Sequence, residues 1–350
     1  MEKMKALIYH EFVDDAGHTR GKVELQEIDK PVCNDNGCLL RVDVASICGG
    51  DVDTLNHGGR NHKIFDGMEL GHEGGCTVVE VGKNVTDWKV GDKVWPFPYF
   101  ITSEMGVKAG ACGTFSEYIL AENCKPNFAL FSTEGLSDVE ASLIEPFTIG
   151  FHAAMRTQPG PGKNALVFGA GCIGLSAAIC CKWKGCDKVA VVGRRKDKLA
   201  VAEALGFKTF SMLDDGWHDQ VRDYFGAGRA YSGQAANVNC CVEATTNDDS
   251  WVDIIPLCNF GCKIAAVSSH EKDIHFNGNF LAFAELEIYG SGGQRFNDAT
   301  EVIECMRSKQ FDIEKVVGKF VTQADFMEGV ELMKSGKIVK ACVDFTGKYA

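Results

Sequence analysis

The sequence lacks a long apolar run, a surplus of basic residues and any internal repeat. Its longest stretch without a charged residue covers 164–181 and is interrupted by three glycines, so we predict no membrane span. Acidic residues outnumber basic ones, 48 to 36, for a net charge of −12, which argues against a nucleic-acid partner. The N-terminal residues become charged too early for a secretory signal, and we expect none.

No Cys-x-x-Cys pair occurs, although the chain contains 16 cysteines. In a short secreted protein so many cysteines would indicate a disulfide scaffold, but here they are scattered over 350 residues. The pairs Cys180-Cys181 and Cys240-Cys241 lie inside apolar runs, where thiols act mostly as small core side chains. We therefore predict a reducing compartment, the cytoplasm.

The rhythm of apolar residues changes near residue 164. Up to about residue 130, short strand-like runs such as LLRVDVAS and CTVVEVG are separated by Gly, Asn and Asp, which is typical of a β-rich unit. From 164 onward, apolar strands such as NALVFG and KVAVVG alternate with helical stretches, which indicates a parallel sheet of βαβ units. The length allows two domains, so we predict an α/β protein with two domains of different class.

A glycine-rich loop follows the first strand of the βαβ region. The stretch FGAGCIG places Gly169, Gly171 and Gly174 around Cys172 and Ile173 in the order G-x-G-x-x-G, between a strand and a helix. The tight turn, the close approach of a pyrophosphate and the packing of helix on strand each require a missing side chain. We predict that this loop binds a dinucleotide. A glycine-rich turn that binds nothing is the alternative.

The second strand of this region does not end in an acidic residue. An acid there would hold the ribose hydroxyls of NAD, but the chain continues with Gly193, Arg194 and Arg195. A glycine leaves room for a 2′-phosphate, and guanidinium groups supply paired donors for it. We predict a preference for NADP(H) over NAD(H). The alternative is a solvated helix start, including Lys198, beside loosely bound NAD.

The stretch LGHEGGC places His72 and Glu73 side by side among glycines. Adjacent side chains in a regular strand point to opposite faces, so the two can share a task only where glycines make the backbone irregular. Cys48 lies among glycines in ASICGGD, and Glu145 lies in a largely apolar segment. A thiol, an imidazole and carboxylates together suit zinc. A solvated turn, a buried thiol and a helix-start carboxylate are the alternatives.

Together these segments resemble the zinc-dependent alcohol and polyol dehydrogenases of the medium-chain dehydrogenase/reductase superfamily. The resemblance covers nearly the whole chain and is carried by SICGGD, GHEGGCTVVEVGKNV, VGDKV, IEPFTIGFHA, VFGAGCIGL and SGKIVKACVDF. It implies a GroES-like β-rich catalytic domain over 1–149 and a Rossmann doubly wound parallel-sheet domain over 150–289. It further implies a C-terminal return to the catalytic domain over 290–350, and a homodimer or homotetramer.

The resemblance also assigns the zinc ligands. Cys48 and His72 match ligands of the family, and Glu145 matches the third protein ligand or the acid beside it. Glu73 matches a glutamate that either binds the zinc or waits next to its ligands. Asp51 matches the acid that orients the ligating histidine and so fixes the tautomer presented to the metal. Cys48, His72, Glu73 and Glu145 are thus the predicted metal ligands and belong to the predicted catalytic site.

Outside the ligand set, Arg295 in SGGQR resembles an arginine that meets the pyrophosphate of the cofactor. Many relatives hold a second, structural zinc with four closely spaced cysteines, but the corresponding region here contains Cys112 alone. The resemblance therefore implies one catalytic zinc and no structural zinc. Cys76 stands where relatives have a glycine, and we interpret it as local repacking rather than as a ligand.

Gly50 occupies the place where relatives usually have a Ser or Thr that relays the alcohol proton. A glycine cannot transfer a proton, so another group or an ordered water must take over this task. Asp53 and Thr54 are the nearest candidates in the sequence, with Glu145 as an alternative near the metal. A capped turn after the cysteine is the other interpretation of Asp53 and Thr54.

The resemblance implies that zinc acts as a Lewis acid on the substrate oxygen while the nicotinamide accepts a hydride. We predict a secondary alcohol and its ketone as the small-molecule substrates. They are polyol-like, or bulkier and lipophilic if Trp95, Phe97 and Tyr99 line an apolar pocket instead of packing within a loop. Two other functions stay open: a zinc-free quinone or enone reductase, and a non-catalytic NADPH-binding protein on the same fold.

Overall fold

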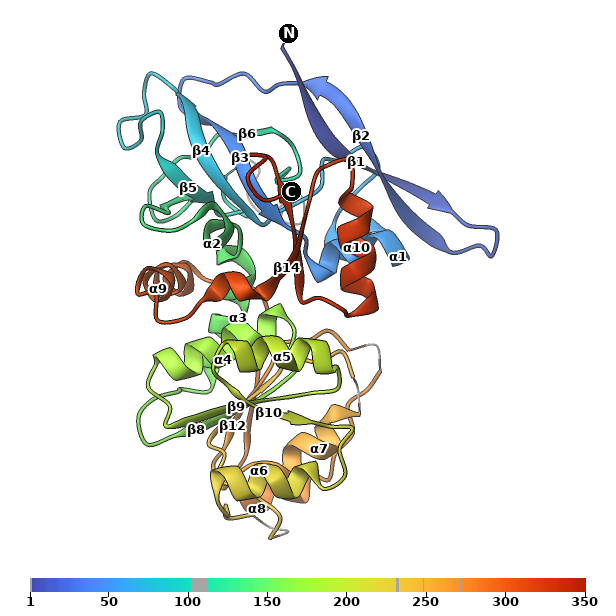
Figure 1. The fold of residues 1–350 in the computed structure, drawn as a ribbon, viewed down its shortest axis with the longest axis vertical. Coiled ribbons are helices and arrows are strands. Elements are labelled where there is room, and N and C mark those ends of the chain that lie inside the picture. The colour runs from blue at the N-terminus through green and yellow to red at the C-terminus, as the bar shows by residue number, and fades with distance from the viewer. Residues whose placement is uncertain (1, 102–111, 231–232, 248, 271) are drawn as a thin grey trace. The chain divides into compact units, whose positions relative to one another are not determined.

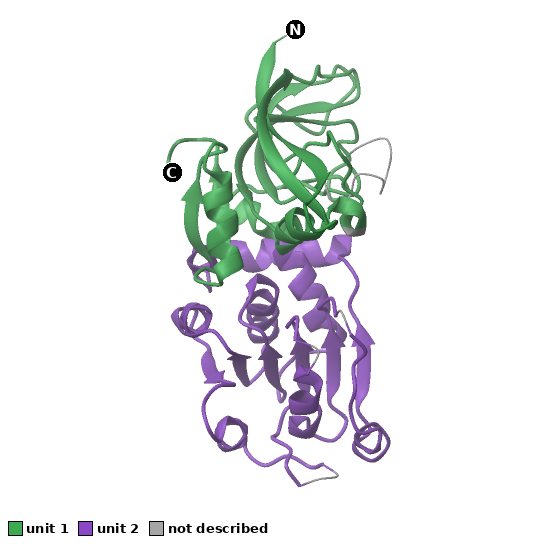
Figure 2. Ribbon diagram, turned by 90° about the vertical axis from the view of Figure 1, so that its right-hand side faces the viewer, with its two compact units in different colours: residues 1–145, 317–350 green, residues 146–316 purple. Residues whose placement is uncertain are grey.

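The computed structural model describes residues 2–101, 112–230, 233–247, 249–270 and 272–350. These residues form two compact units, coloured separately in Figure 2. Unit 1 comprises residues 1–145 and 317–350, and unit 2 comprises residues 146–316. Within the described ranges, every helix falls short of the length and hydropathy that crossing a bilayer requires.

Unit 1 contains a two-stranded and a seven-stranded sheet (Figure 1). The two-stranded sheet pairs β1 (Lys3–Val13) with β2 (Thr19–Asp29) in antiparallel fashion. The larger sheet has the order β14-β15-β3-β4-β5-β7, with β6 also paired to β3. Its strands are β3 (Cys38–Ser46), β4 (Gly74–Val81), β5 (Lys93–Pro96), β6 (Tyr118–Ala121), β7 (Leu130–Ser132), β14 (Val317–Val321) and β15 (Lys340–Asp344). The first part of the chain is therefore β-rich, as its short apolar runs predict.

The C-terminal segment returns to unit 1 through β15. This strand pairs antiparallel with β3, which places Cys342 opposite Ser46. The return matters for the site, because β3 leads directly to Cys48 and β15 begins with the buried Lys340. The helices of this unit are α1 (Gly49–His57), the 3-10 helix η1 (Gly59–His62), α2 (Asp138–Ser142) and α10 (Phe326–Ser335). The helix α3 (Ile144–Arg156) begins where the first segment of unit 1 ends, at Glu145.

Unit 2 is a six-stranded parallel sheet in the order β10-β9-β8-β11-β12-β13. Its strands are β8 (Asn164–Phe168), β9 (Lys188–Gly193), β10 (Lys208–Ser211), β11 (Cys240–Glu243), β12 (Lys263–Ala266) and β13 (Glu287–Gly290). Its other elements are α4 (Cys172–Trp183), α5 (Lys196–Ala204), α6 (Trp217–Phe225), α7 (Ser250–Leu257), α8 (Asn279–Ala284), α9 (Phe296–Arg307) and η2 (Ile313–Val316). Residues 164–168 are all buried, which explains the continuous apolar character of β8.

The units divide the chain at different places from the ranges that the family resemblance implies. The second unit extends beyond residue 289, because β13 pairs in parallel with β12 and α9 buries an apolar face that includes Val302 and Met306. The chain rejoins unit 1 only at Val317, where β14 begins. At the other boundary the division falls at Glu145, one residue after the start of α3. Short return strands cannot be separated from a preceding helix by composition alone.

Candidate metal centre and cofactor loop

Cys48 lies at the start of α1, just after β3 ends. It is the N-cap of this helix, with φ −84° and ψ 152°, and its thiol accepts a hydrogen bond from Gly50 N at 3.3 Å. The Asp51 carboxylate accepts a reciprocal bond from Cys48 N at 2.8 Å. A sulfur held at a helix N-terminus is favoured as a thiolate, whereas burial raises the pKa of Cys48.

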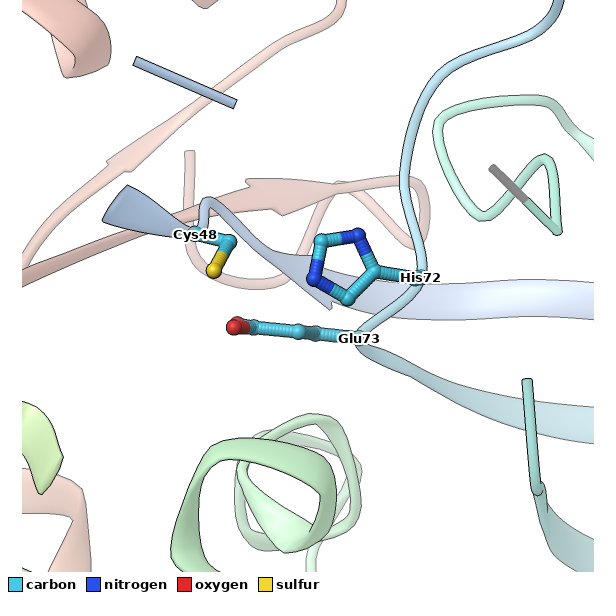
Figure 3. Close-up of side chains that lie close together, drawn as sticks. All are labelled: Cys48, His72 and Glu73. Atoms are coloured by element: carbon cyan, nitrogen blue, oxygen red, sulfur yellow. The ribbon is translucent and has the colours of Figure 1, made fainter. Parts of the chain in front are cut away.

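His72 and Glu73 lie on an irregular segment that ends where β4 begins at Gly74. Gly71 has φ +97°, and a Cβ on it would lie 2.6 Å from Thr114 Oγ1, so only glycine fits there. The turn carries both side chains toward Cys48, as Figure 3 shows. One ligand atom each from Cys48, His72 and Glu73 lies within 4.8 Å of the other two. Adjacent residues can therefore face one ion, because the backbone is not a regular strand.

This cluster fits a zinc ion. Zinc bonds of about 2.0 to 2.3 Å in a tetrahedral arrangement place ligand atoms about 3.5 Å apart, which small side-chain adjustments of this cluster achieve. Burial would lower the pKa of His72, but the Cys48 thiolate and the carboxylate of Asp51 raise it well above its usual value. The Asp51 carboxylate lies 3.8 Å from His72 Nδ1, too far for a direct hydrogen bond. The same acidic groups that raise the pKa of His72 would favour a cation at the centre of the cluster.

Two residues outside the cluster, Lys340 and Ser46, contact the carboxylate of Glu73. Its carboxylate accepts from Lys340 Nζ at 2.9 Å through one oxygen and lies 2.6 Å from the same nitrogen through the other. The hydroxyl of Ser46 donates to the same carboxylate. Lys340 and Glu73 are both buried, although 267 residues separate them. The sequence motif containing Lys340 was recognisable, but nothing in it pointed to this partner.

Replacing Lys340 with Met is expected to lower the free energy of unfolding of the metal-free protein by about 3 to 5 kcal/mol, because it leaves a buried carboxylate without its cation. Lys319→Met is the matched control, because its ion pair with Glu328 is exposed and is worth at most about 1 kcal/mol. Adding Glu73→Gln to Lys340→Met is expected to restore much of the loss. Urea denaturation measures the free energy of unfolding of all three variants. An equal decrease for Lys340→Met and Lys319→Met would contradict the interpretation that the buried ion pair stabilises the protein.

Glu145 is the second residue of α3 and is buried near the cluster. Burial raises the pKa of its carboxyl to about 7; the charge of His72 lowers it and that of Glu73 raises it. These influences place Glu145 beside the cluster. Its carboxylate is nevertheless not one of the three closely grouped ligand atoms found among the described residues.

Asp53 and Thr54 have different surroundings. Asp53 accepts hydrogen bonds from two histidines, His57 Nδ1 at 2.7 Å and His62 Nε2 at 3.0 Å. The Thr54 side chain is fully buried, and its hydroxyl makes no hydrogen bond to the described residues. The two neighbours therefore point to different faces of α1, and only Asp53 joins other titratable groups. His62 was not singled out from the sequence.

The aromatic residues in and after β5 also differ in their surroundings. Trp95 and Phe97 are fully buried, with ring centroids 5.2 Å apart, and both contact Phe131. They belong to the packed interior of unit 1. Tyr99 is partly buried, and burial is the main cause that raises the pKa of its hydroxyl. The charges of Glu145 and Cys48 raise this pKa further, so Tyr99 lies near the metal cluster.

Cys76 and Cys112, which the sequence analysis set apart from the ligands, are buried to different degrees. Cys76 lies inside β4 and is buried, with a pKa raised well above the usual value by burial. Cys112 is partly buried, and burial raises its pKa to about 12. Residues 102–111 of the region that corresponds to the structural-zinc lobe lie outside the described residues.

The glycine loop of unit 2 connects β8 to α4. Gly169 has φ +109°, and a Cβ there would lie 2.2 Å from the carbonyl oxygen of Ala244. A Cβ on Gly174 would lie 1.9 Å from the carbonyl oxygen of Gly169. Gly171, the N-cap of α4, has open space at its Cβ position. A backbone open to its surroundings at a helix N-terminus fits a bound pyrophosphate, with Cys172 and Ile173 in the first turn.

Gly193 ends β9 and has little room for a side chain. A Cβ there would lie 3.1 Å from Leu199 Cδ2 and 3.5 Å from Ala170 Cβ. Arg194 and Arg195 are exposed. Lys198 is partly buried, and burial followed by the charge of Arg195 lowers its pKa. Lys198 is thus a desolvated cation beside the loop, which the sequence alone did not distinguish from a solvated residue.

Arg295 is the N-cap of α9 and is exposed. Its backbone nitrogen donates to Asp298 at 3.0 Å, and Asp298 also bonds to His152 Nδ1 at 2.9 Å. The structure therefore fixes the backbone of Arg295 and leaves its side chain at the surface. Binding of the pyrophosphate by this arginine stays a prediction.

Comparisons with known proteins agree with this geometry. The family model for the alcohol dehydrogenase GroES-like domain matches residues 34–126, and that for zinc-binding dehydrogenases matches residues 172–308. A protein of Agrobacterium fabrum provisionally named D-xylulose reductase is 32% identical over 265 residues, which cover 66% of this chain and 73% of that protein. The chain belongs to the zinc-dependent alcohol and polyol dehydrogenases of the medium-chain dehydrogenase/reductase superfamily. This confirms the predicted family.

This zinc-type alcohol dehydrogenase is an oxidoreductase with a GroES-like domain and a Rossmann domain, as predicted. It is 25% identical to the L-threonine 3-dehydrogenase of Aliivibrio fischeri over 339 residues, covering 92% of this chain and 95% of that protein. The solved structure of 2R,3R-butanediol dehydrogenase from Bacillus subtilis shares its fold with a TM-score of 0.80 at 24% identity, covering 97% of this chain and 99% of that one.

Proposed function

We propose that this dehydrogenase interconverts a secondary alcohol and its ketone by hydride transfer, with one zinc ion and with NADP(H) preferred over NAD(H). The observation that carries the proposal is the cluster of Cys48, His72 and Glu73, whose ligand atoms lie within 4.8 Å of one another. The names of two relatives point to the same chemistry: a threonine 3-dehydrogenase acts on a secondary hydroxyl, and D-xylulose is a ketone.

Cys48, His72 and Glu73 would hold the metal, with Glu145 as the nearby carboxylic acid. When bound, zinc supplies a Lewis acid that makes the substrate hydroxyl more acidic. Asp51, whose carboxylate lies 3.8 Å from His72 Nδ1, would help to orient His72 toward the metal. Ser46 and Lys340 hold Glu73 in place, so its carboxylate needs little reorganisation. We propose a single zinc, since Cys112 is the one cysteine in the region of the structural lobe.

The cofactor would bind at the loop of Gly169, Gly171 and Gly174, with Arg295 as a further contact for the pyrophosphate. The preference for NADP(H) would come from three cations around Gly193, namely Arg194, Arg195 and Lys198. Guanidinium groups bind a phosphate through paired, charge-assisted hydrogen bonds. A desolvated lysine such as Lys198 gains more from an anion than a fully hydrated one does.

Metal analysis of the purified protein, combined with an NADPH-linked screen of ketones and polyols, tests this function. We expect about one zinc per chain and turnover of at least one secondary alcohol or its ketone. Reduction of quinones or enones by metal-free protein would favour a zinc-free reductase. Tight NADPH binding without zinc or turnover would favour a non-catalytic protein on the same fold.

A cytoplasmic location and a homodimer or homotetramer belong to the same proposal. All 16 cysteines are free thiols in the structure, among them the metal-binding Cys48, and a reducing compartment keeps such thiols reduced. Fractionation of the native cell and the mass of the purified enzyme in solution test the two statements separately.

A further inference from the structure

His62 lies beside Gly50, close to the Cys48 sulfur. A Cβ on Gly50 would lie 3.3 Å from His62 Cε1, 3.4 Å from His62 Nδ1 and 3.6 Å from Cys48 Sγ. The imidazole therefore borders the space that a side chain at position 50 would enter. A larger residue at 50 would press against this ring, so the glycine and the histidine suit each other sterically.

Asp53 fixes the other edge of the His62 ring. Its Oδ2 lies 3.0 Å from His62 Nε2, while its Oδ1 lies 2.7 Å from Nδ1 of His57. Burial would raise the pKa of Asp53, but hydrogen bonds from the two histidines lower it below its usual value, so the carboxylate stays charged. A carboxylate at Nε2 keeps the proton on that nitrogen, which leaves Nδ1 on the Gly50 side as a proton acceptor.

This group also has access to water. The side chains of His62, Asp53 and His57 are 36%, 40% and 56% exposed, respectively. Asp51 and Glu145, the other acids near the metal cluster, are buried. A proton that reaches the ring of His62 can therefore pass directly to solvent, whereas Asp51 and Glu145 are themselves buried.

We propose that His62 is the proton acceptor of the reaction and that Asp53 is the positioning residue that sets its tautomer. The inference rests on the proposed alcohol dehydrogenase function. During oxidation the O–H bond of the substrate breaks and its proton passes to His62 Nδ1, directly or through one water. The carbinol hydride passes to NADP⁺, and His62 then releases the proton to solvent. In ketone reduction the same nitrogen returns the proton to the nascent hydroxyl oxygen.

His62→Gln, made in the full-length zinc-loaded enzyme, tests the acceptor. We expect kcat for alcohol oxidation to fall by about 100-fold or more, as is usual for loss of a proton-transfer group, with zinc content and NADPH affinity unchanged. Added imidazole is expected to restore part of the activity of His62→Ala. His218→Gln is the matched control, because His218 makes the same kind of pair through Nε2 with Asp253 at 3.0 Å; it should leave kcat unchanged.

A second measurement does not depend on turnover. Histidine labelled with ¹⁵N is expected to report His62 with its proton on Nε2 in the wild-type protein, and Asp53→Asn is expected to abolish that preference and lower kcat by about tenfold or more. Suppose that the wild type is active and contains zinc. Undiminished kcat in both His62 variants would then overturn the role of His62 as proton acceptor, and so would a proton on His62 Nδ1. Neither result would affect the proposed function. A wild type without zinc or turnover would overturn the proposed function itself.

Discussion

Cys48→Ser and His72→Ala are expected to lose the zinc and the alcohol dehydrogenase activity together. Each removes one of the two ligands that the cluster geometry and the family pattern both select. Loss of the Lewis acid removes several kcal/mol of transition-state stabilisation, so kcat/KM should fall by at least about 1,000-fold. Metal analysis and steady-state kinetics on the same preparations measure both effects.

Two variants outside the cluster provide controls for these losses. Cys33→Ser replaces a partly buried thiol in the segment before β3, and His18→Ala replaces an exposed imidazole. Both should keep the zinc and the wild-type rate. NADPH binding should persist in the ligand variants, because the glycine loop belongs to unit 2 and the ligands to unit 1. Full activity of metal-depleted Cys48→Ser would refute the zinc mechanism, and two tightly bound zincs in the native protein would refute the single-zinc proposal.

Replacing Arg194 and Arg195 with alanine is expected to remove the preference for NADP. A charge-assisted contact with a phosphate is worth about 1.5 to 3 kcal/mol, so each arginine should contribute about 10- to 150-fold to kcat/KM with NADP. The values with NAD should change little, because NAD has no 2′-phosphate. Comparing the two cofactors with the same alcohol therefore gives the test its internal reference.

The surroundings of Gly193 determine which substitution can make the enzyme prefer NAD over NADP. Gly193→Asp supplies the missing acid, but its Cβ would lie 3.1 Å from Leu199 Cδ2, so this side chain must move slightly. Added to the double arginine variant, it should place NAD ahead of NADP. Lys208→Ala is the control, since Lys208 pairs with Ala190 near the start of β9 rather than with its end. Better use of NAD than NADP by the native enzyme would contradict the assignment.

The sequence determined the features that depend on local pattern. The glycine spacing at 169, 171 and 174 predicted the loop between β8 and α4, although the contact that excludes a Cβ on Gly169 is with Ala244, which lies far along the chain. The alternation of apolar strands and helices likewise predicted the parallel sheet, since a strand covered on both faces must be apolar throughout. The residue types Cys, His and Glu pointed to zinc through their chemistry alone.

Within α1, more could have been predicted. Asp53 and His57 are four residues apart, so helical geometry places them on one face. Thr54 is the next residue and is rotated by about 100° around the helix, which turns it toward the buried core. Unless a helix is assigned to this segment, the sequence does not distinguish Asp53 from Thr54.

Only the tertiary structure brought distant residues to the site. Lys340 reaches Glu73 because β15 pairs with β3, and His62 reaches Gly50 because η1 follows α1 through a sharp turn at Gly58. Neither pairing has a local signal, since one lysine or histidine in a sequence resembles many others. Side-chain partners that lie far apart along the chain are selected by the packing of whole elements. The chain thus encodes which chemistry is present locally, whereas the fold decides which groups compensate charge and which can move a proton.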